Sequence, residues 1–469
     1  AVSGGAEGIV GAPAGTVTVA SVAGSGQVRL ADGTVTAARQ GTVRLHDRAR
    51  VGTNGDGGGS IRIRGGTLVV ENATIGTTNT GATDGAGGID VAAGAADIAG
   101  STLVSGTVGS GKGAPIRLRA GTLRLRDGTR VASTPQGLGG AGAITVNAGD
   151  LSMVGTGATY STMIESSLPF GATGRPDPVT VTADRLDIRD GAAIRSVTGG
   201  LARAADLTVA AGDISVTGDG ARFVRSRIVS ETQFGSAGST GAVSVTAAGA
   251  LRLTDEGQIG SLLLGQSDAG PVTVRADSLT VAAATRDALT GIFSQTSFGS
   301  TANAGLVDVR ARSIALSGPL AQLSSVTFSG GTAGSVSVQA DSLSVTGTNG
   351  QGFTGITSNA EFGSSGHAGT VTVVTTGPLT LLRAAEIGSN TFGTGNAGDV
   401  VVRAGSLTVA GAEGTTLRTG IGSSAEQFSQ GSAGRVNVSV DGHLDLSQGG
   451  LITTDTHTKG NAGAASVTA

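Results

Sequence analysis

Two glycine-rich segments of this sequence have residue types that could bind a charged ligand. GTVGSGKG at 106–113 resembles a phosphate-binding loop, in which Lys112 would contact phosphate oxygens. The next residue is Gly113, where magnesium binding requires Ser or Thr, and no helical pattern follows. GDGGGSI at 55–61 resembles a calcium turn, but it occurs once, whereas calcium-binding solenoids repeat it. We therefore expect neither a nucleotide site nor a calcium site.

Groups for metal binding and acid–base catalysis are scattered. The sequence has no cysteine, and its four histidines lack the paired spacing of a zinc site: His46, His367, His443 and His457. Polysaccharide-cleaving enzymes need clustered carboxylates, yet the outward carboxylates are isolated, as at Asp187, Asp308 and Asp445. Sugar clefts also favour Trp and Tyr, and only Tyr160 is present. We expect no catalytic residue, cofactor or metal. A polysaccharide-active enzyme stays the alternative, and two carboxylates within reach of each other in a groove would support it.

Arginine recurs at alternate positions near the amino end: Arg62, Arg64, Arg117, Arg119, Arg124 and Arg126. Alternate residues of a strand share one face, so these side chains could form a patch for anionic glycans. The alternative is a charged, solvated surface. The formal net charge is −3 and unevenly spread, and it requires no nucleic-acid partner.

Composition predicts a thin, repetitive core. The chain has 83 glycines and 2% aromatic residues, too few large side chains for the thick core of a compact enzyme. The glycines lack the G-X-Y period of collagen, and the regular aliphatic positions argue against disorder. No apolar run is long enough for a membrane helix, so we expect a chain that does not span a membrane. The sequence ends inside a repeat, and we expect it to be part of a longer chain.

An apolar-x-apolar triplet after a glycine-rich run sets the repeat. It begins at Ile61, Ile89, Ile116, Ile144, Val179, Leu207, Val243, Val272, Val307, Val336, Val371, Val400, Val436 and Val467. From Ile144 onward short and long steps alternate: 35 residues separate Val336 from Val371, 29 separate Val371 from Val400, and such pairs repeat about every 64 residues.

Each repeat contains three apolar segments, for example VTV (371–373), LTL (379–381) and Ile387. Alternation within a triplet predicts a strand with one face inward, and Gly, Asn, Asp and Ser predict the corners. The sequence therefore predicts an all-β fold, a right-handed parallel β-helix of about 14 three-strand turns, with short coils of about 29 residues and long coils of about 35. We expect irregular coils over 1–60 and a regular array over 61–469.

The long coils add residues before the third apolar segment, and each addition carries a large side chain expected to fold back onto the core: Tyr160, Phe223, Leu289, Phe353 and Leu417. Phenylalanine follows the third segment of the same coils, at Phe170, Phe234, Phe298, Phe362 and Phe428. We interpret this column as a structural packing ladder completed by aliphatic neighbours. The alternative is an exposed binding stripe.

The repeated phrase also carries a family resemblance. In it, a GNAG or GSAG corner is followed by V-x-V-x-A, S-L-x-V and I-x-S, as in GNAGDVVVRAGSLTVAGAEGTTLRTGIGSS (395–424). This order of motifs resembles that of filamentous-haemagglutinin-like exoproteins of two-partner secretion. The resemblance covers the repeats of 61–469. It implies a Gram-negative bacterial protein, secreted or held at the cell surface, that acts in adhesion, biofilm formation or contact. It also implies an outer-membrane transporter as export partner. No amino-terminal secretion-domain signature and no toxin domain is found in this sequence.

These observations favour a non-catalytic extracellular stalk or scaffold of a large adhesin. Its expected partners are surface glycans or neighbouring cells. One alternative is a self-assembling filament subunit that associates end to end, because unpaired strand edges at the ends of such an array need cover. The other alternative is the polysaccharide-active enzyme.

Overall fold

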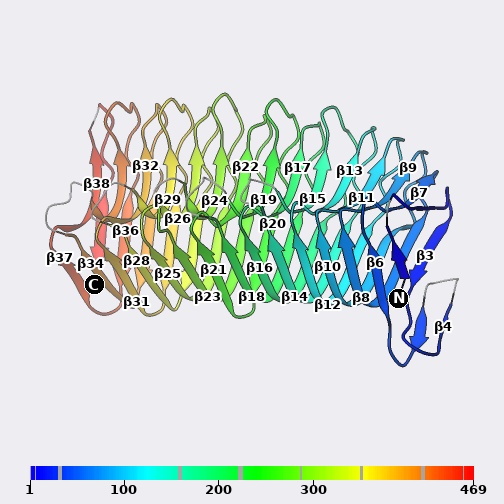
Figure 1. The fold of residues 1–469 in the computed structure, drawn as a ribbon. Helices are drawn as coiled ribbons and strands as arrows, with labels where there is room; N and C mark the ends of the chain where they lie inside the picture. The colour runs from blue at the N-terminus through cyan, green and yellow to red at the C-terminus, as the bar shows by residue number, and fades with distance from the viewer. Residues whose placement is uncertain are drawn as a thin grey trace. The chain divides into compact units, whose positions relative to one another are not determined.

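The computed structural model describes residues 2–5, 7–29, 34–156, 161–219, 225–285, 288–348, 352–412, 418–457 and 459–469. The chain is an all-β parallel β-solenoid of about 13 turns, with a period of about 31 residues and three parallel sheets. The predicted fold class is therefore confirmed, with about one turn fewer than expected. The chain divides into two compact units, 1–212 with 236–238 and 213–235 with 239–469. Figure 1 shows each unit as a succession of parallel strands.

In the first unit, the first and second apolar segments lie on β1 (Val2–Gly4), β3 (Thr16–Ala20), β6 (Thr42–Leu45), β8 (Ser60–Glu71), β10 (Gly88–Ala99), β12 (Ile116–Arg126), β14 (Ile144–Val154) and β16 (Val179–Arg189). The third segment lies on β2 (Ile9–Gly11), β7 (Arg50–Gly55), β9 (Thr74–Asn79), β11 (Thr102–Thr107), β13 (Arg130–Pro135), β15 (Met163–Leu168) and β17 (Ala193–Thr198). The boundary between the units falls within β18 (Leu207–Thr217).

In the second unit, the first two segments lie on β20 (Val243–Ala247), β21 (Ala250–Thr254), β23 (Val272–Ala282), β25 (Val307–Ser317), β27 (Val336–Ala340), β28 (Ser342–Thr346), β30 (Val371–Thr375), β31 (Pro378–Leu382), β33 (Val400–Ala404), β34 (Ser406–Ala410), β36 (Val436–Val440), β37 (Leu444–Ser447) and β39 (Ala465–Thr468). The third segment lies on β19 (Arg227–Thr232), β22 (Gln258–Leu263), β24 (Thr290–Thr296), β26 (Ala321–Thr327), β29 (Thr354–Ala360), β32 (Ala385–Thr391), β35 (Thr419–Ala425) and β38 (Gly450–Thr456).

The first two segments often share one long strand, which the sequence did not predict. In β16 every second residue is buried, except that two adjacent residues, Asp184 and Arg185, are both exposed in the middle of the strand. Two consecutive outward side chains break the period of two, so the inward face changes phase at that point. The corner between these segments is therefore a bend within the strand.

Identical residues stack from turn to turn in the core. Val336 pairs with Val371, and Val371 pairs with Val400. All three side chains are fully buried, as is Val338. The predicted dry interior of aliphatic triplets is confirmed.

The recurring glycine corner has a steric cause. A Cβ on Gly334 would lie 2.1 Å from the carbonyl oxygen of Gly305, one turn earlier. A Cβ on Gly369 would lie 2.4 Å from the same atom of Gly334, and the pattern continues at Gly398. Real Cβ atoms do not approach an oxygen this closely, so stacked corners at this spacing exclude any side chain.

Buried serines tie these corners to the third sheet. Ser358 accepts a hydrogen bond from the amide of Gly369 at 2.8 Å and donates to the carbonyl oxygen of Gly334 at 2.9 Å. Ser389 and Ser423 make the same two bonds to the glycines of their own turns and of the turn before. Each hydroxyl thus satisfies one amide and one carbonyl group that would otherwise be buried without a partner.

Residues 1–60 contribute more regular structure than the sequence indicated. Val17 pairs with Ile61 and Val51 with Ile75, in the same parallel registers as later turns. The departure is an antiparallel hairpin of β4 (Gly26–Val28) and β5 (Val35–Ala37). In the described ranges, no helix has the length and apolar character needed to cross a membrane.

Candidate functional site

The phenylalanines predicted to form a packing ladder are exposed. Their exposed fractions are 71% for Phe170, 78% for Phe234, 64% for Phe298, 56% for Phe362 and 84% for Phe428. The structure corrects the packing interpretation, and the reason is corner length. The corner after β24 runs nine positions, from Thr296 to Gly305, whereas the corner after β26 runs seven, from Thr327 to Gly334. The longer corner carries Phe298 past the end of β24, and Gly299 then turns the chain with φ of 81°.

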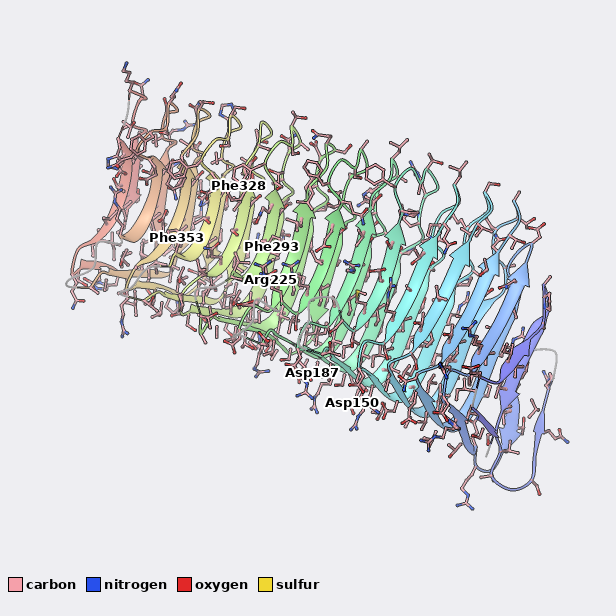
Figure 2. All side chains as sticks on the ribbon, turned by 45° about the horizontal axis from the view of Figure 1, so that its top comes forward. Asp150, Asp187, Arg225, Phe293, Phe328 and Phe353 are labelled. Carbon is pink, nitrogen blue, oxygen red and sulfur yellow. The ribbon has the colours of Figure 1, made fainter. Side chains whose placement is uncertain are left out.

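Shorter corners supply the intervening rings in the second unit. Phe328 follows β26 and its ring centroid lies 5.0 Å from that of Phe298. Phe392 follows β32 and lies 5.3 Å from Phe362. Phe428 follows β35 in the next turn. Figure 2 shows Phe328 at this edge of the turns. Five consecutive turns therefore each carry a phenylalanine at the same edge.

The extra loops of the long coils bring their large residues toward the core, where the structure describes them. Leu289 and Phe353 are half-buried, and the backbone oxygen of each accepts a hydrogen bond from a glutamine of the turn beside it, Gln258 at 2.6 Å and Gln322 at 3.0 Å. Tyr160, Phe223 and Leu417 lie outside the described residues.

The predicted arginine patch is interleaved with carboxylates. Its members lie on β8 and β12, and β10 runs between these two strands. Asp90 on β10 pairs with Arg64 at 2.7 Å and with Arg119 at 3.1 Å. Arg126 pairs with Asp97 at 3.0 Å. Arg117 and Arg124 are exposed, and Arg62 is half-buried. The anionic-glycan hypothesis stays a prediction, with part of the positive charge offset by neighbours.

The carboxylates that the sequence predicts to be isolated have local partners. Asp308 lies 2.5 Å from the guanidinium of Arg275, and Asp187 lies 3.6 Å from that of Arg189. Burial raises the pKa of Asp187 from its ordinary value. Asp445 accepts a hydrogen bond from Ser447 at 3.3 Å. Over the described ranges, no three His, Asp or Glu side chains gather to hold a metal ion.

A polar cluster that the sequence did not reveal lies on the outward face of the third sheet in the second unit. It lines a cavity of about 30 Å³ and includes Glu386, Asn390, Arg418, Glu426 and Asp455. The amide of Asn390 donates to Glu386 Oε1 at 2.8 Å, and Arg418 forms an ion pair with Asp455. These residues are far apart in sequence, but outward residues of neighbouring turns pair directly, as Ser424 does with Asn390 and Asp455.

Glycine creates the space for this cluster. A Cβ on Gly388 would lie 2.0 Å from Glu386 Oε1, so the carboxyl can fold over the sheet because Gly388 has no side chain. Burial raises the pKa of Glu386 to about 7; nearby Glu426 raises it too, against the hydrogen bond from Asn390. A carboxyl group with such a pKa can donate or accept a proton near neutral pH. The cavity has room for only about one or two water molecules, so a polymer could meet this group only from outside.

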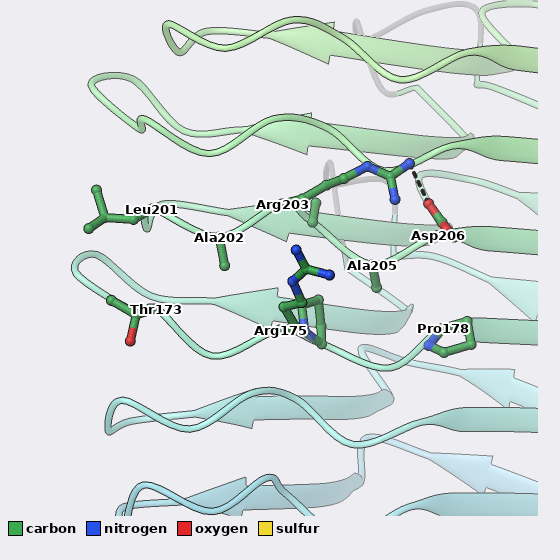
Figure 3. A pocket seen from close by; sticks show the side chains of 10 residues that line it. Thr173, Arg175, Pro178, Leu201, Ala202, Arg203, Ala205 and Asp206 are labelled. Carbon is green, nitrogen blue, oxygen red and sulfur yellow. Dashed lines mark ion pairs between the residues drawn. The ribbon is translucent and has the colours of Figure 1, made fainter.

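A groove in the first unit lies between two neighbouring corners. It has a volume of about 530 Å³ and is lined by residues 173, 175–176, 178 and 201–206. Figure 3 shows Arg175 extending from one corner beside Arg203 of the next, and Arg203 pairs with Asp206 at 2.7 Å. The other lining side chains are those of Thr, Pro, Leu and Ala. This composition suits an anionic group held by Arg175, but it offers no acid–base pair.

Another cavity, of about 270 Å³, lies over the third sheet of the second unit. Arg225, Arg227, Phe293 and Gln295 are among its lining residues. Arg227 pairs with Glu231 at 3.3 Å, and both are nearly buried. Figure 2 shows Arg225 and Phe293 over this face. The buried pair makes this region polar, and each charge of the pair is offset by the other.

No protein-family model, curated protein or solved structure matches this sequence.

Proposed function

We propose that this chain is a non-catalytic extracellular scaffold, the stalk of a large bacterial adhesin or surface exoprotein. The observation that supports it most is the parallel stacking within each unit, where the same inward triplet recurs in register, as from Val336 to Val371 and Val400. A stack built this way holds a row of corners at constant spacing, which suits repeated contacts with an extended partner.

The repeat phrase supports the cellular setting. Its resemblance to filamentous-haemagglutinin-like exoproteins favours a Gram-negative bacterium, export through an outer-membrane transporter and a place at the cell surface. The absence of cysteine from the sequence is compatible with this setting, because stacked turns need no disulfides.

Surface display tests the proposal. The chain is anchored on a non-adhesive bacterial strain, and attachment to glycan-coated surfaces and to neighbouring cells is counted against a strain that displays an unrelated protein. We expect increased attachment together with no cleavage of a panel of polysaccharides. Cells that attach no better than the control contradict the adhesive role, and release of reducing ends or unsaturated sugars contradicts the non-catalytic part.

A polysaccharide-active enzyme is the second candidate, because Glu386, Glu426 and Asp455 line one cavity beside Arg418. In that case Glu386, with its pKa near 7, would act as the general acid. Glu386→Gln would then abolish cleavage of the polymer and leave the fold intact. If the wild-type chain cleaves no polymer, this candidate is rejected.

A further inference from the structure

The aromatic edge of the second unit is an exposed apolar surface with a regular pitch. We define it by the rings of Phe298, Phe328, Phe362, Phe392 and Phe428, one on each of five consecutive turns. Three of these rings are more than half exposed, and the other two lie half-buried between them. Two neighbouring pairs are in ring contact, Phe298 with Phe328 and Phe362 with Phe392. Exposed apolar groups clustered in this way mark an interaction site more often than scattered single residues do.

The pitch of this edge matches an extended sugar polymer. Neighbouring parallel strands lie about 4.8 Å apart, and the two ring pairs in contact have centroid separations of 5.0 and 5.3 Å. In an extended β-1,4-linked glycan, each pyranose advances the chain by nearly the same amount. The apolar C–H face of a pyranose packs on the electron-rich face of an aromatic ring. A glycan parallel to the stack would thus meet one ring per sugar.

The groups beside the rings favour a neutral ligand. The five corners that carry them, 296–306, 327–335, 360–370, 391–399 and 425–435, contain the charged residues Glu361, Asp399, Glu426 and Arg435, and Arg435 is paired with Asp399 at 3.3 Å. Half-buried Asn359 lies close to the corners, and it pairs in register with Asn390, which is itself buried. Carboxylate and amide groups can form hydrogen bonds with sugar hydroxyls. A carboxylate repels an anionic polymer, and a neutral amide has no net charge to attract one.

We propose that the aromatic edge binds an extended, neutral β-1,4-linked glycan that lies along the turns. This inference rests on the proposed adhesive function and gives it a ligand class. Two other occupants fit less well. An anionic membrane would meet Glu361 and Glu426 instead of the basic residues that draw proteins to such surfaces. A second copy would have to build its interface on a single row of rings, whereas stable interfaces have a broad apolar centre surrounded by a polar rim.

The test compares the wild-type chain with F298S/F362S/F428S, which removes the three most exposed rings of the edge. Cellohexaose and chitohexaose are titrated calorimetrically, and retention on insoluble cellulose and chitin is measured, with dextran and heparin as other polymers. We expect binding to at least one β-1,4-linked ligand that survives 0.5 M salt, because no ion pair is involved. The triple variant should bind about a hundredfold more weakly, because the loss of three rings, each worth roughly a kcal/mol of stacking, corresponds to about that factor.

Phe170→Ser is the matched control. Phe170 occupies the same corner position in the first unit, where the neighbouring corners carry Leu138 and Leu201 instead of aromatic rings. This variant should bind as the wild type does. Circular dichroism checks that both variants keep the β fold.

Three results overturn the proposal: no binding of either β-1,4-linked ligand, equal binding by the triple variant, or binding of heparin alone. Ring-dependent self-association in sedimentation would assign the edge to a second copy, and ring-dependent flotation with phosphatidylcholine–phosphatidylserine vesicles would assign it to a bilayer. If displayed cells attach through a surface that the triple substitution does not affect, this inference fails while the adhesive function stands.

Discussion

At the scale of single residues, the fold depends on polar side chains that stand where the apolar pattern would predict none. The inward positions two residues after the third-segment isoleucines are serines, at Ser358, Ser389 and Ser423. Serine hydroxyls are common nucleophiles in enzymes. In these turns they connect adjacent glycine corners and therefore have a structural role. In these three turns the buried hydroxyl therefore serves to satisfy backbone groups.

Ser358→Ala tests this role. The change leaves the amide of Gly369 and the carbonyl oxygen of Gly334 without their hydroxyl partner in a buried site, and we expect the free energy of unfolding to fall by about 1–3 kcal/mol. Ser344→Ala, on an outward position of β28, is the control and should change it by less than about 0.5 kcal/mol. Urea unfolding followed by circular dichroism measures both. Equal stabilities would mean that the hydroxyl bridge contributes little.

Glu386 gives a pH-dependent prediction. Its pKa is about 7 in the folded chain against 4.5 ordinarily. Between these two values the folded state keeps a proton that the unfolded state has lost, so stability falls as the pH rises from 4.5 to 7. Glu386→Gln should remove this loss and stabilise the chain above pH 7 by up to about 3 kcal/mol, with little effect below pH 4.5. Thermal unfolding at pH 4 and pH 8 measures the difference. A variant with the wild-type pH dependence contradicts the assignment.

At the scale of elements, the corners determine what the strands can present. Every one of these corners packs a glycine directly on the corner before it, and the corners that are two residues longer also carry a phenylalanine into solvent. The strands are nearly identical from turn to turn, so the differences between turns that matter for binding lie in the corners. This division is typical of scaffolds that hold functional loops.

Gly334→Ala and Gly330→Ala separate these two kinds of corner position. The first Cβ would lie 2.1 Å from the oxygen of Gly305, whereas the second would meet its nearest neighbour, Ser365, at 3.5 Å. We expect Gly334→Ala to destabilise the chain by about 1–3 kcal/mol or more, because the backbone of two stacked corners must separate. Gly330→Ala should be close to neutral. The urea midpoints of the two variants measure the contrast, and similar midpoints would show that the corners yield easily.

At the scale of the whole molecule, each turn is an exchangeable part within its unit. Val336, Val371 and Val400 occupy equivalent registers, and so do Ile356, Ile387 and Ile421 on the third sheet. Stability in such an array comes from contacts between neighbouring turns more than from any one turn.

Deleting residues 371–399 should therefore yield a folded chain with one turn fewer. The deletion joins Thr370 to Val400 and lets β33 pair with β27 in the register that β30 used. Deleting 371–384 removes only two of the three strands of a turn, so the following strands cannot align with their counterparts. Circular dichroism and limited proteolysis should find the first variant folded and resistant and the second sensitive. Equal resistance would contradict a turn-based architecture.

The sequence alone determined the period, the strand class and the buried aliphatic residues, because alternating aliphatic triplets on a fixed repeat can be enclosed only by stacking turns. It did not determine which large residues are exposed. Phe298 recurs with the period of the core residues, and its place in a corner beyond the end of β24 is what leaves it exposed. Nor could it reveal the cluster at Glu386, because Asn390, Arg418 and Asp455 meet through the register of separate turns. Local pattern decides what is buried, whereas register between distant segments decides what lies together on the surface.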